Sequence, residues 1–233
     1  MRADGSTYSL SNDDRTIPRE LESVEALELR IWNTGFERFE ELARLPNLVV
    51  LEVMDYRSDS FAPLGGLLRL RRLHVTHFPR VDSLDPLSGL GALEDLTLET
   101  LPSWDASKKR QVVKSLRPLA ALGKLRSLRL AGVYAEDGDL SPIGELTGLR
   151  ELAIANLYSQ EQFALLSAKL PDVRSSFLAP CLQLGISCGK CGGEKVMLSG
   201  ADVPNPKVVC PVCQRRKFET TVERFLSLAR RGA

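Results

Sequence analysis

The chain has 233 residues, of which 43% are apolar and 26% are charged, and its formal net charge is +1. This composition is typical of a domain with a large core, and it excludes a low-complexity or strongly charged disordered chain. No apolar run approaches the roughly 18 residues that a membrane span requires, and the N-terminus lacks the pattern of a secretion signal. We therefore expect a cytoplasmic protein that makes no membrane contact.

The first 20 residues are mostly polar, and only Tyr8, Leu10 and Ile17, followed by Leu21, are suited to burial. A stacked-repeat protein needs a cap with a polar outer face at each end of its core. Residues 1–20 are therefore predicted to form an N-terminal cap with a frayed start.

A Leu-x-x-Leu-x-Leu motif or a conservative variant then recurs six times. Its first positions are Val24, Leu48, Leu70, Leu93, Leu125 and Leu149, which are 24, 22, 23, 32 and 24 residues apart. This period predicts a solenoid of stacked repeats with one insertion. Apolar residues two apart face one side of a strand, and a single copy cannot bury that face. We expect seven such strands to form one curved parallel sheet.

A second apolar pattern connects the strands and usually contains a proline. It occurs at 61–64, 84–87, 116–119 and 140–143, while Phe39, Leu42 and Leu45 repeat it without proline. Apolar spacing of three residues with an early proline predicts one or two turns of 3₁₀ or α-helix on the convex side.

These repeats resemble the leucine-rich repeat family, in particular the short repeats of internalins, in which such a strand is followed by a segment like Leu84-Asp-Pro-Leu87-Ser-Gly-Leu90. The resemblance covers about residues 20–180 and implies an α/β solenoid with a parallel concave sheet and short convex 3₁₀ or α segments. At the ninth repeat position, where the family has asparagine, this chain has Trp32, Tyr56, Phe78, Leu101, Val133 and Leu157. We expect an apolar or aromatic row to fill the turn.

An insertion enlarges the fourth repeat at residues 102–115. Asp105 is placed to cap a short helix on the convex side, with Val112, Val113 and Leu116 packed against the core. The exposed cations would then be Lys108, Lys109, Arg110 and Lys114. The insertion is interpreted either as a tolerated loop extension or as a second contact site.

A degenerate seventh copy begins at Leu170-Pro-Asp-Val173, and in its register Leu178 lies in the core and Cys181 takes the ninth position. The solenoid is therefore predicted to span residues 21–181, in about seven repeats.

The residues between the buried strand positions should point outward from the concave sheet, where this fold most often binds partners. They are Glu28, Arg30, Glu52, Met54, Arg72, His74, Thr76, Asp95, Thr97, Glu99, Ser127, Arg129, Glu151 and Ala153. Mixed charge favours a protein or peptide partner over a polyanion. The alternative is that most of these side chains are merely solvated. His74 and His77 could form a metal or acid–base pair, but an exposed histidine and a turn histidine are the simpler interpretation.

The most specific chemical signal is two Cys-x-x-Cys pairs, Cys188–Cys191 and Cys210–Cys213, separated by 18 residues. Each tight turn presents two thiolates, and a hairpin between the turns completes a tetrahedral zinc site. Residues 182–233 are therefore predicted to be a zinc-ribbon-like module with a C-terminal helix. Lys195–Leu198 and Lys207–Val209 should pair as strands, and residues 200–206 should form the hairpin loop. Two disulfides, a redox pair or rubredoxin-type iron remain alternatives.

The zinc is expected to be structural, because four cysteine ligands leave no open position to activate water. Residues 182–233 carry nine Lys/Arg and four Asp/Glu, a charge of 9 − 4 = +5. Arg215, Arg216 and Lys217 lie beside a predicted helix with Phe218, Val222, Phe225 and Leu226 on one stripe and a capping box at Thr220 and Glu223. This basic module is the alternative binding site, for nucleic acid.

No catalytic motif accompanies these features. The chain has no Gly-rich phosphate loop, no Gly-x-Ser-x-Gly elbow and no His-Glu-x-x-His helix. Cys181 has no histidine nearby in sequence to activate it. The sequence therefore predicts a non-enzymatic module for protein–protein interaction that binds its partner through the concave face and holds a structural zinc.

Overall fold

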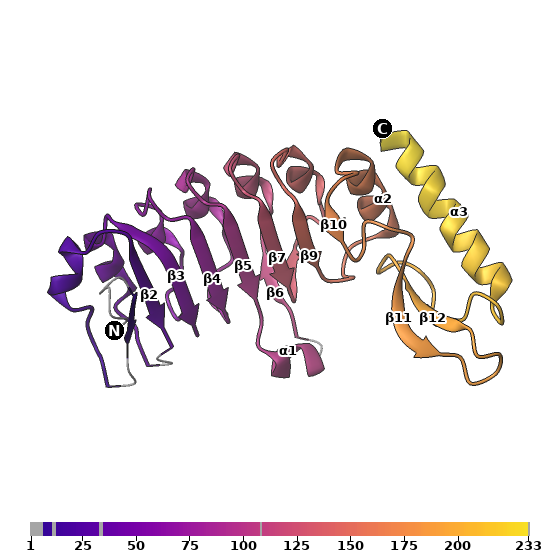
Figure 1. The fold of residues 1–233 in the computed structure, drawn as a ribbon, viewed down its shortest axis with the longest axis horizontal. Coiled ribbons are helices and arrows are strands. Elements are labelled where there is room, and N and C mark those ends of the chain that lie inside the picture. The colour runs from indigo at the N-terminus through magenta and orange to yellow at the C-terminus, as the bar shows by residue number, and fades with distance from the viewer. Residues whose placement is uncertain (1–6, 11–12, 33–34, 108, 233) are drawn as a thin grey trace.

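The computed structural model describes residues 7–10, 13–32, 35–107 and 109–232 of the chain. Its main element is a parallel sheet in which eight strands lie side by side in chain order (Figure 1). The strands are β1 (Thr7–Leu10), β2 (Leu27–Ile31), β3 (Leu48–Met54), β4 (Arg72–Thr76), β5 (Asp95–Glu99), β7 (Ser127–Ala131), β9 (Glu151–Ile154) and β10 (Arg174–Ser175). Six of them are the predicted repeat strands, β10 lies in the degenerate copy, and β1 comes from the predicted cap.

The predicted register of the repeats is confirmed. Leu73, Leu96 and Leu128 lie side by side on β4, β5 and β7, and all three are fully buried. Equivalent leucines on neighbouring repeats extend this row in both directions. Since burying one leucine side chain contributes about 1.5–3 kcal/mol, the stacked rows are the main source of stability.

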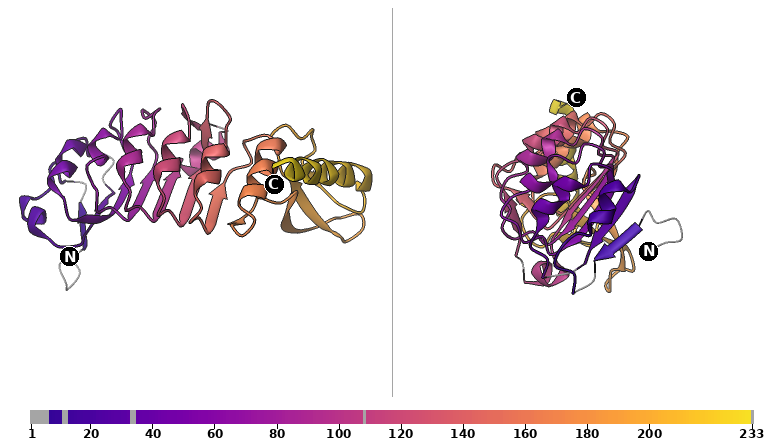
Figure 2. Two further views of the ribbon diagram at one scale, coloured as in Figure 1. Left: turned by 90° about the horizontal axis from the view of Figure 1, so that it is seen from above. Right: turned by 90° about the vertical axis from the view of Figure 1, so that its left-hand side faces the viewer.

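Short 3₁₀ helices form the second layer, on the side of the array away from the strands (Figure 2). They are η1 (Arg19–Ser23), η2 (Phe39–Arg44), η3 (Ala62–Leu64), η4 (Asp85–Gly89), η5 (Arg117–Ala121) and η6 (Ser141–Glu145). The last four have proline in their first turn, as predicted. Proline suits this position because its fixed φ is helical and its missing N–H would have no helical partner.

Aromatic residues fill the turn of the first repeats, as the ninth position predicts. The ring centres of Phe39 and Tyr56 are 4.3 Å apart, and those of Tyr56 and Phe61 are 5.1 Å apart. The ring centres of Phe61 and Phe78 are 5.5 Å apart. Val133 is also buried at this position. The prediction is wrong for Trp32, which follows the first repeat strand and is 59% exposed.

The insertion does not lie on the convex side. Its helix α1 (Pro102–Ala106) projects from the edge of the sheet where the strands end (Figure 1). After it, β6 (Gln111–Val113) pairs in parallel with β8 (Val133–Ala135). Strand alternation buries Val113 and leaves Val112 48% exposed, which corrects the predicted packing of Val112.

The predicted cap of the inserted helix is also wrong, because α1 begins at Pro102 and Asp105 lies inside it. The side chain of Asp105 and all of Lys108 lie outside the described part of the chain.

After the last repeat, α2 (Gln160–Lys169) is capped by the Ser159 hydroxyl, which accepts a hydrogen bond from the Gln162 N–H at 3.2 Å. A small antiparallel sheet then forms from β11 (Cys181–Ser187), β12 (Glu194–Leu198) and β13 (Val208–Val209). The β12–β13 pair was predicted and β11 was not. Cys181 therefore belongs to this small sheet and packs against its apolar cluster, not against the solenoid core.

The chain ends in α3 (Arg215–Gly232), which packs against α2 at the end of the solenoid (Figure 1). Phe225 is buried in the solenoid core, while Phe218 packs against the apolar cluster of the small sheet. The helix begins five residues before Thr220, so the predicted capping box at Thr220 and Glu223 is wrong, and Leu226 is exposed. Within the described residues, no helix is both long and apolar enough to cross a membrane.

Candidate functional site

Two tight turns bring the four cysteines together. Cys188 and Cys191 lie in the turn between β11 and β12, and Cys210 and Cys213 lie between β13 and α3. In the first turn, the Gly192 N–H donates to the Cys188 carbonyl at 2.8 Å, and Gly192 has a φ of +74° that glycine adopts without strain. In the second, the Gln214 N–H donates to the Cys210 carbonyl at 2.9 Å. All four Sγ atoms lie within 4.8 Å of one another.

The thiol geometry fits a tetrahedral metal ion. Zinc–sulfur bonds of about 2.3 Å place tetrahedral sulfurs about 3.8 Å apart. The Sγ atoms of Cys188 and Cys213 are 3.9 Å apart, and those of Cys191 and Cys210 are 3.4 Å apart. Among the residues that the structure describes, no acidic or histidine side chain joins the cluster. A closed set of four soft donors can hold zinc or iron and leaves no position for a reacting water.

The electrostatics of the turns favour thiolates that a cation can bind. Backbone N–H groups of Lys190 and Cys191 lower the pKa of Cys188 to about 6. The backbone N–H of Cys213 likewise lowers the pKa of Cys210. The pKa of Cys213 changes in the opposite direction. Its contact with Cys191 and the other thiols raises its pKa to about 12. A bound dication would remove the repulsion between adjacent thiolates, because its positive charge compensates their negative charges.

The small sheet is joined to the solenoid by hydrogen bonds from the β12–β13 loop. The Gly200 N–H donates to Asn156 Oδ1 at 2.7 Å, and Asn156 Nδ2 donates to the Leu198 carbonyl at 3.0 Å. The Gln160 N–H donates to Asp202 Oδ1 at 2.6 Å. The cysteine-bearing module therefore covers the last repeat, whose apolar end would otherwise face water.

The structure places every predicted concave residue outside the core, in rows that cross the strands. One row contains Arg30, Glu52, His74, Thr97, Arg129 and Ala153, in register on neighbouring strands. The row beside it contains Glu28, Arg72, Asp95, Ser127 and Glu151. Met54, Thr76 and Glu99 form a third, shorter row. Whether these residues contact a partner stays a prediction.

Three concave residues were not predicted from the sequence: one on each end strand of the sheet and one on β3. Thr7 on β1 lies beside Glu28 and donates to its Oε2 at 3.1 Å. Arg174 on β10 pairs with Glu151. Val50 occupies an outward position between Glu28 and Arg72. The alternation of Tyr8 and Leu10 was the signal for β1, but it is only three residues long.

Most charged concave residues form ion pairs across the strands. Arg30 Nε lies 3.0 Å from Glu52 Oε2, and Arg72 Nε lies 4.0 Å from Asp95 Oδ2. His74 Nε2 forms a hydrogen bond, not counted among these ion pairs, with Glu99 Oε1 at 2.9 Å. These pairs hold the side chains in place and balance the charge of the face, but each surface pair contributes only about 0–1 kcal/mol.

The two histidines do not come together. His74 lies on the concave face, whereas His77 lies in the turn after β4, with a φ of +62° and its ring 4.9 Å from that of Trp104. His77 Nε2 is 3.8 Å from Asp55 Oδ1. Within the described residues, the four cysteines form the one group suited to hold a metal.

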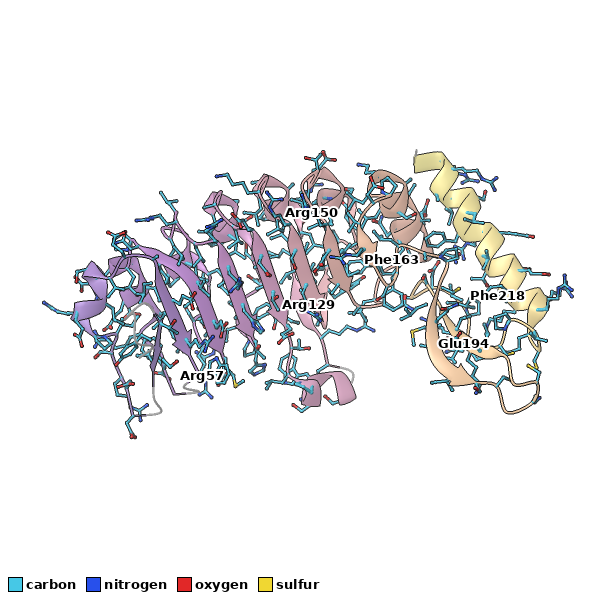
Figure 3. All side chains as sticks on the ribbon, viewed as in Figure 1. Arg57, Arg129, Arg150, Phe163, Glu194 and Phe218 are labelled. Atoms are coloured by element: carbon cyan, nitrogen blue, oxygen red, sulfur yellow. The ribbon has the colours of Figure 1, made fainter. Side chains whose placement is uncertain are left out.

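The basic cluster lies at the start of α3, next to Phe218, which Figure 3 labels, and two of its three side chains bond to other groups of the fold. Lys217 Nζ donates to the carbonyls of Pro204 and Pro206 at 2.5 and 2.7 Å. Arg215 Nε lies 2.7 Å from Glu219 Oε1. Arg216 is exposed.

Comparison with solved structures finds similar chains among internalins and leucine-rich repeat proteins. An internalin C2 from Listeria monocytogenes is 21% identical with a TM-score of 0.54, and the match covers 73% of this chain and 69% of that one. A second internalin from the same organism is 15% identical with a TM-score of 0.36, over 69% and 63% of the two chains. A leucine-rich repeat protein of Leptospira interrogans is 17% identical with a TM-score of 0.38, over 70% and 52%.

No family model and no curated protein sequence matches the chain. The likeness to the first internalin, together with the sheet and its 3₁₀ layer, shows that the chain has a leucine-rich repeat fold. The prediction of that fold is confirmed.

Proposed function

We propose that this chain is a non-enzymatic recognition module that binds a protein or peptide through its concave face. The supporting observation is the mixed charge of that face, where Arg30, Glu52 and His74 alternate in register across three strands. Such a surface complements the polar surface of another protein, whereas a polyanion would meet repelling carboxylates. The proposed contacts are Glu28, Arg30, Glu52, Met54, Arg72, His74, Asp95, Thr97 and Arg129.

The four cysteines Cys188, Cys191, Cys210 and Cys213 are proposed to hold a structural Zn²⁺. All five cysteines of the chain are free thiols, which fits a reducing compartment such as the cytoplasm. Metal binding contributes about 10–16 kcal/mol in small zinc modules and would fold this small sheet, which then covers the last repeat. The proposed units are the cap 1–20, the solenoid 21–181 and the zinc module 182–233, with β11 starting at the boundary.

Nucleic-acid binding through Arg215, Arg216 and Lys217 has weaker support. A phosphate-binding cluster needs cations whose donors are free, but Lys217 donates to two carbonyls and Arg215 pairs with Glu219.

A pull-down with two variants tests the proposal. Glu52→Ala, Arg72→Ala and His74→Ala together should abolish capture of a protein partner from the native cytosol and leave the thermal unfolding transition unchanged, because all three side chains lie outside the core. Arg215→Gln, Arg216→Gln and Lys217→Gln together should leave capture unchanged. If instead the Arg215, Arg216 and Lys217 variant loses capture, the concave variant keeps it, and nuclease treatment abolishes it, the protein binds nucleic acid.

A further inference from the structure

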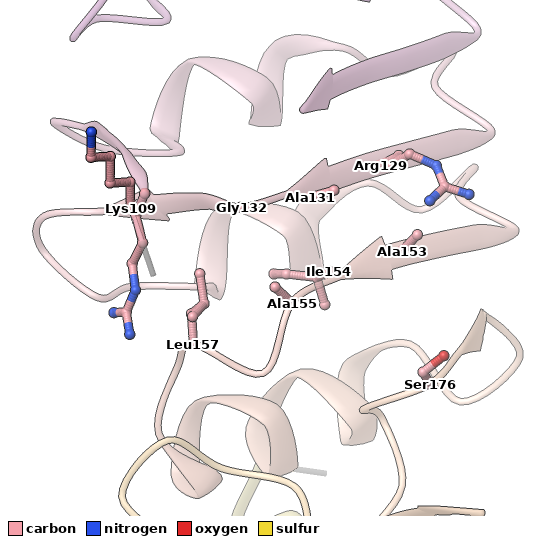
Figure 4. A pocket seen from close by; sticks show the side chains of 10 residues that line it. Lys109, Arg129, Ala131, Gly132, Ala153, Ile154, Ala155, Leu157 and Ser176 are labelled. Carbon is pink, nitrogen blue, oxygen red and sulfur yellow. The ribbon is translucent and has the colours of Figure 1, made fainter. Parts of the chain in front are cut away.

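A pocket of about 400 Å³ opens on the concave face beside the insertion. Its floor is formed by small residues at the ends of β7 and β9, namely Ala131, Gly132, Ala153 and Ala155. The alanines carry only a methyl group and the glycine has no side chain, so these positions leave room above the sheet. Arg129 lies at one end of this floor and Lys109 lies at the other (Figure 4).

Of the described residues that line the pocket, three are cationic and none is acidic; the cations are Lys109, Arg110 and Arg129. On the rest of the concave face, Arg30 and Arg72 each have a carboxylate partner. Arg129 differs because its neighbours in register are Thr97 and Ala153, which carry no charge. Within the described part of the chain, Arg129 has no ion pair. The pocket is therefore a local positive region on a face that is otherwise balanced.

Two cations of the insertion, Lys109 and Arg110, lie beside aromatic rings. Lys109 Nζ lies 6.0 Å from the ring centre of Trp104, and the Arg110 guanidinium lies 5.8 Å from that of Tyr134. An aromatic ring attracts a cation and leaves its N–H donors free. Lys114, which the sequence grouped with these residues, is different, since its Nζ lies 2.9 Å from Asp82 Oδ2.

The segment after Arg110 is fixed to the solenoid. The Gln111 N–H donates to the Gly132 carbonyl at 2.9 Å, and the buried Gln111 side chain donates to the Val81 carbonyl at 2.7 Å. Strand β6 continues this attachment by pairing with β8. The insertion is therefore anchored at the pocket. This anchoring preorganises Lys109 and Arg110 for binding, which lowers the entropic cost of ordering them.

We propose that this pocket binds an extended acidic peptide segment of the protein partner, with one carboxylate at Arg129 and another at Lys109 and Arg110. The small floor lets a peptide backbone approach the sheet, and arginine binds carboxylates through paired N–H donors. The inference rests on the proposed function and specifies the chemistry of the partner. A nucleic acid would meet the carboxylates of Asp95, Glu99 and Glu151 on the surrounding face.

Amide NMR of the full-length protein tests this with a synthetic ten-residue peptide of alternating Glu and Ala. The signals of Gly132 and Ala155 should shift saturably, whereas the same peptide with Gln in place of Glu should leave them unmoved. Lys109→Gln, Arg110→Gln and Arg129→Gln together should weaken binding about tenfold or more, because the charge-assisted hydrogen bonds are lost. A matched variant, Arg117→Gln, Lys124→Gln and Arg150→Gln, removes three exposed cations outside the pocket and should bind normally.

Three outcomes would overturn the inference: equal shifts with the Gln peptide, equal weakening by the matched variant, or shifts confined to α3. Displacement of the acidic peptide by duplex DNA from the same site would also overturn it, in favour of a polyanion. The proposed function is tested separately. If the pocket variant captures the native partner normally while the Glu52, Arg72 and His74 variant does not, concave recognition stands and the acidic-peptide site fails.

Discussion

The side-chain amide of Asn156 bonds to two backbone groups of the segment from Leu198 to Gly200: its Oδ1 accepts from the Gly200 N–H at 2.7 Å, and its Nδ2 donates to the Leu198 carbonyl at 3.0 Å. Asn156 follows the last full repeat strand, and Gly200 lies in the loop of the cysteine-bearing sheet. This contact joins the solenoid to the cysteine-bearing sheet. It also makes the position of the loop sensitive to a single added methyl group.

Gly200→Ala should destabilise the protein by roughly 1–3 kcal/mol. Gly200 has a φ of +116°, and an added Cβ would lie 2.7 Å from Gln160 Cβ and 2.8 Å from the Gln160 nitrogen. The loop would have to move away from Asn156 and lose both hydrogen bonds. Urea unfolding measures the effect. Gly91→Ala is the control, because its Cβ would have no neighbour within 4 Å, and equal losses in the two variants would show that the loop contact is unimportant.

The purified protein should contain one zinc ion per chain. Cys188→Ser and Cys210→Ser should each release it, since three thiolates leave the tetrahedron incomplete. Acidification should release it from the native protein, because protons compete with the metal for the thiolates. Elemental analysis before and after acidification measures the content. Cys181→Ser is the control and should retain the metal, as Cys181 lies outside the cluster. Metal-free reduced protein, or stoichiometric iron, would contradict the prediction.

The repeat pattern predicted the sheet, its register and the proline-containing 3₁₀ layer because each of these repeats a local rule. Apolar spacing of two residues defines the buried side of every strand, so one correct assignment at Leu96 determines those at Leu73 and Leu128. The cysteine turns were predictable for a similar reason, since ligand spacing is local. β1 was missed because a four-residue strand with one fully buried leucine, Leu10, gives too weak an alternation.

Features that depend on distant contacts were not predictable. The sequence gives no sign that Lys109 and Arg110 lie near Arg129, because strand pairing between β6 and β8 determines the direction of the insertion. The start of α3 was misplaced by the apparent capping box at Thr220. The helix begins instead directly after the second cysteine turn, at Arg215, where the Phe218 N–H donates to the Gln214 carbonyl at 3.0 Å.

Leu96→Asp should prevent cooperative folding of the middle repeats. Its side chain is fully buried between Leu73 and Leu128, and an unpaired charge there costs several kcal/mol. Thr97→Asp, one residue further along the same strand, should be mild because Thr97 lies on the concave face between His74 and Arg129. Thermal unfolding distinguishes the two variants. Comparable damage from both would mean that the inward and outward positions are assigned incorrectly.

Tyr158→Phe should destabilise the protein by about 1–3 kcal/mol at pH 8, because it removes the partner of a buried backbone group. The Tyr158 hydroxyl accepts a hydrogen bond from the Ala135 N–H at 3.0 Å, next to the end of β8. Urea unfolding measures the loss. Tyr134→Phe is the control, as Tyr134 is half-buried beside Tyr158 and its removal should have a smaller effect.

The same tyrosine predicts a pH dependence. Burial raises the pKa of Tyr158 from 10.0 to about 12, because the folded state disfavours the phenolate. Its contribution is therefore fully present below pH 10 and is lost as the pH rises from 10 towards 12, where the unfolded chain ionises first. The wild-type free energy of unfolding should fall more steeply over this interval than that of Tyr158→Phe, by about 3 kcal/mol in total. If the two proteins lose stability equally, the alkaline loss arises from other groups, such as Tyr56, whose pKa is also raised by burial.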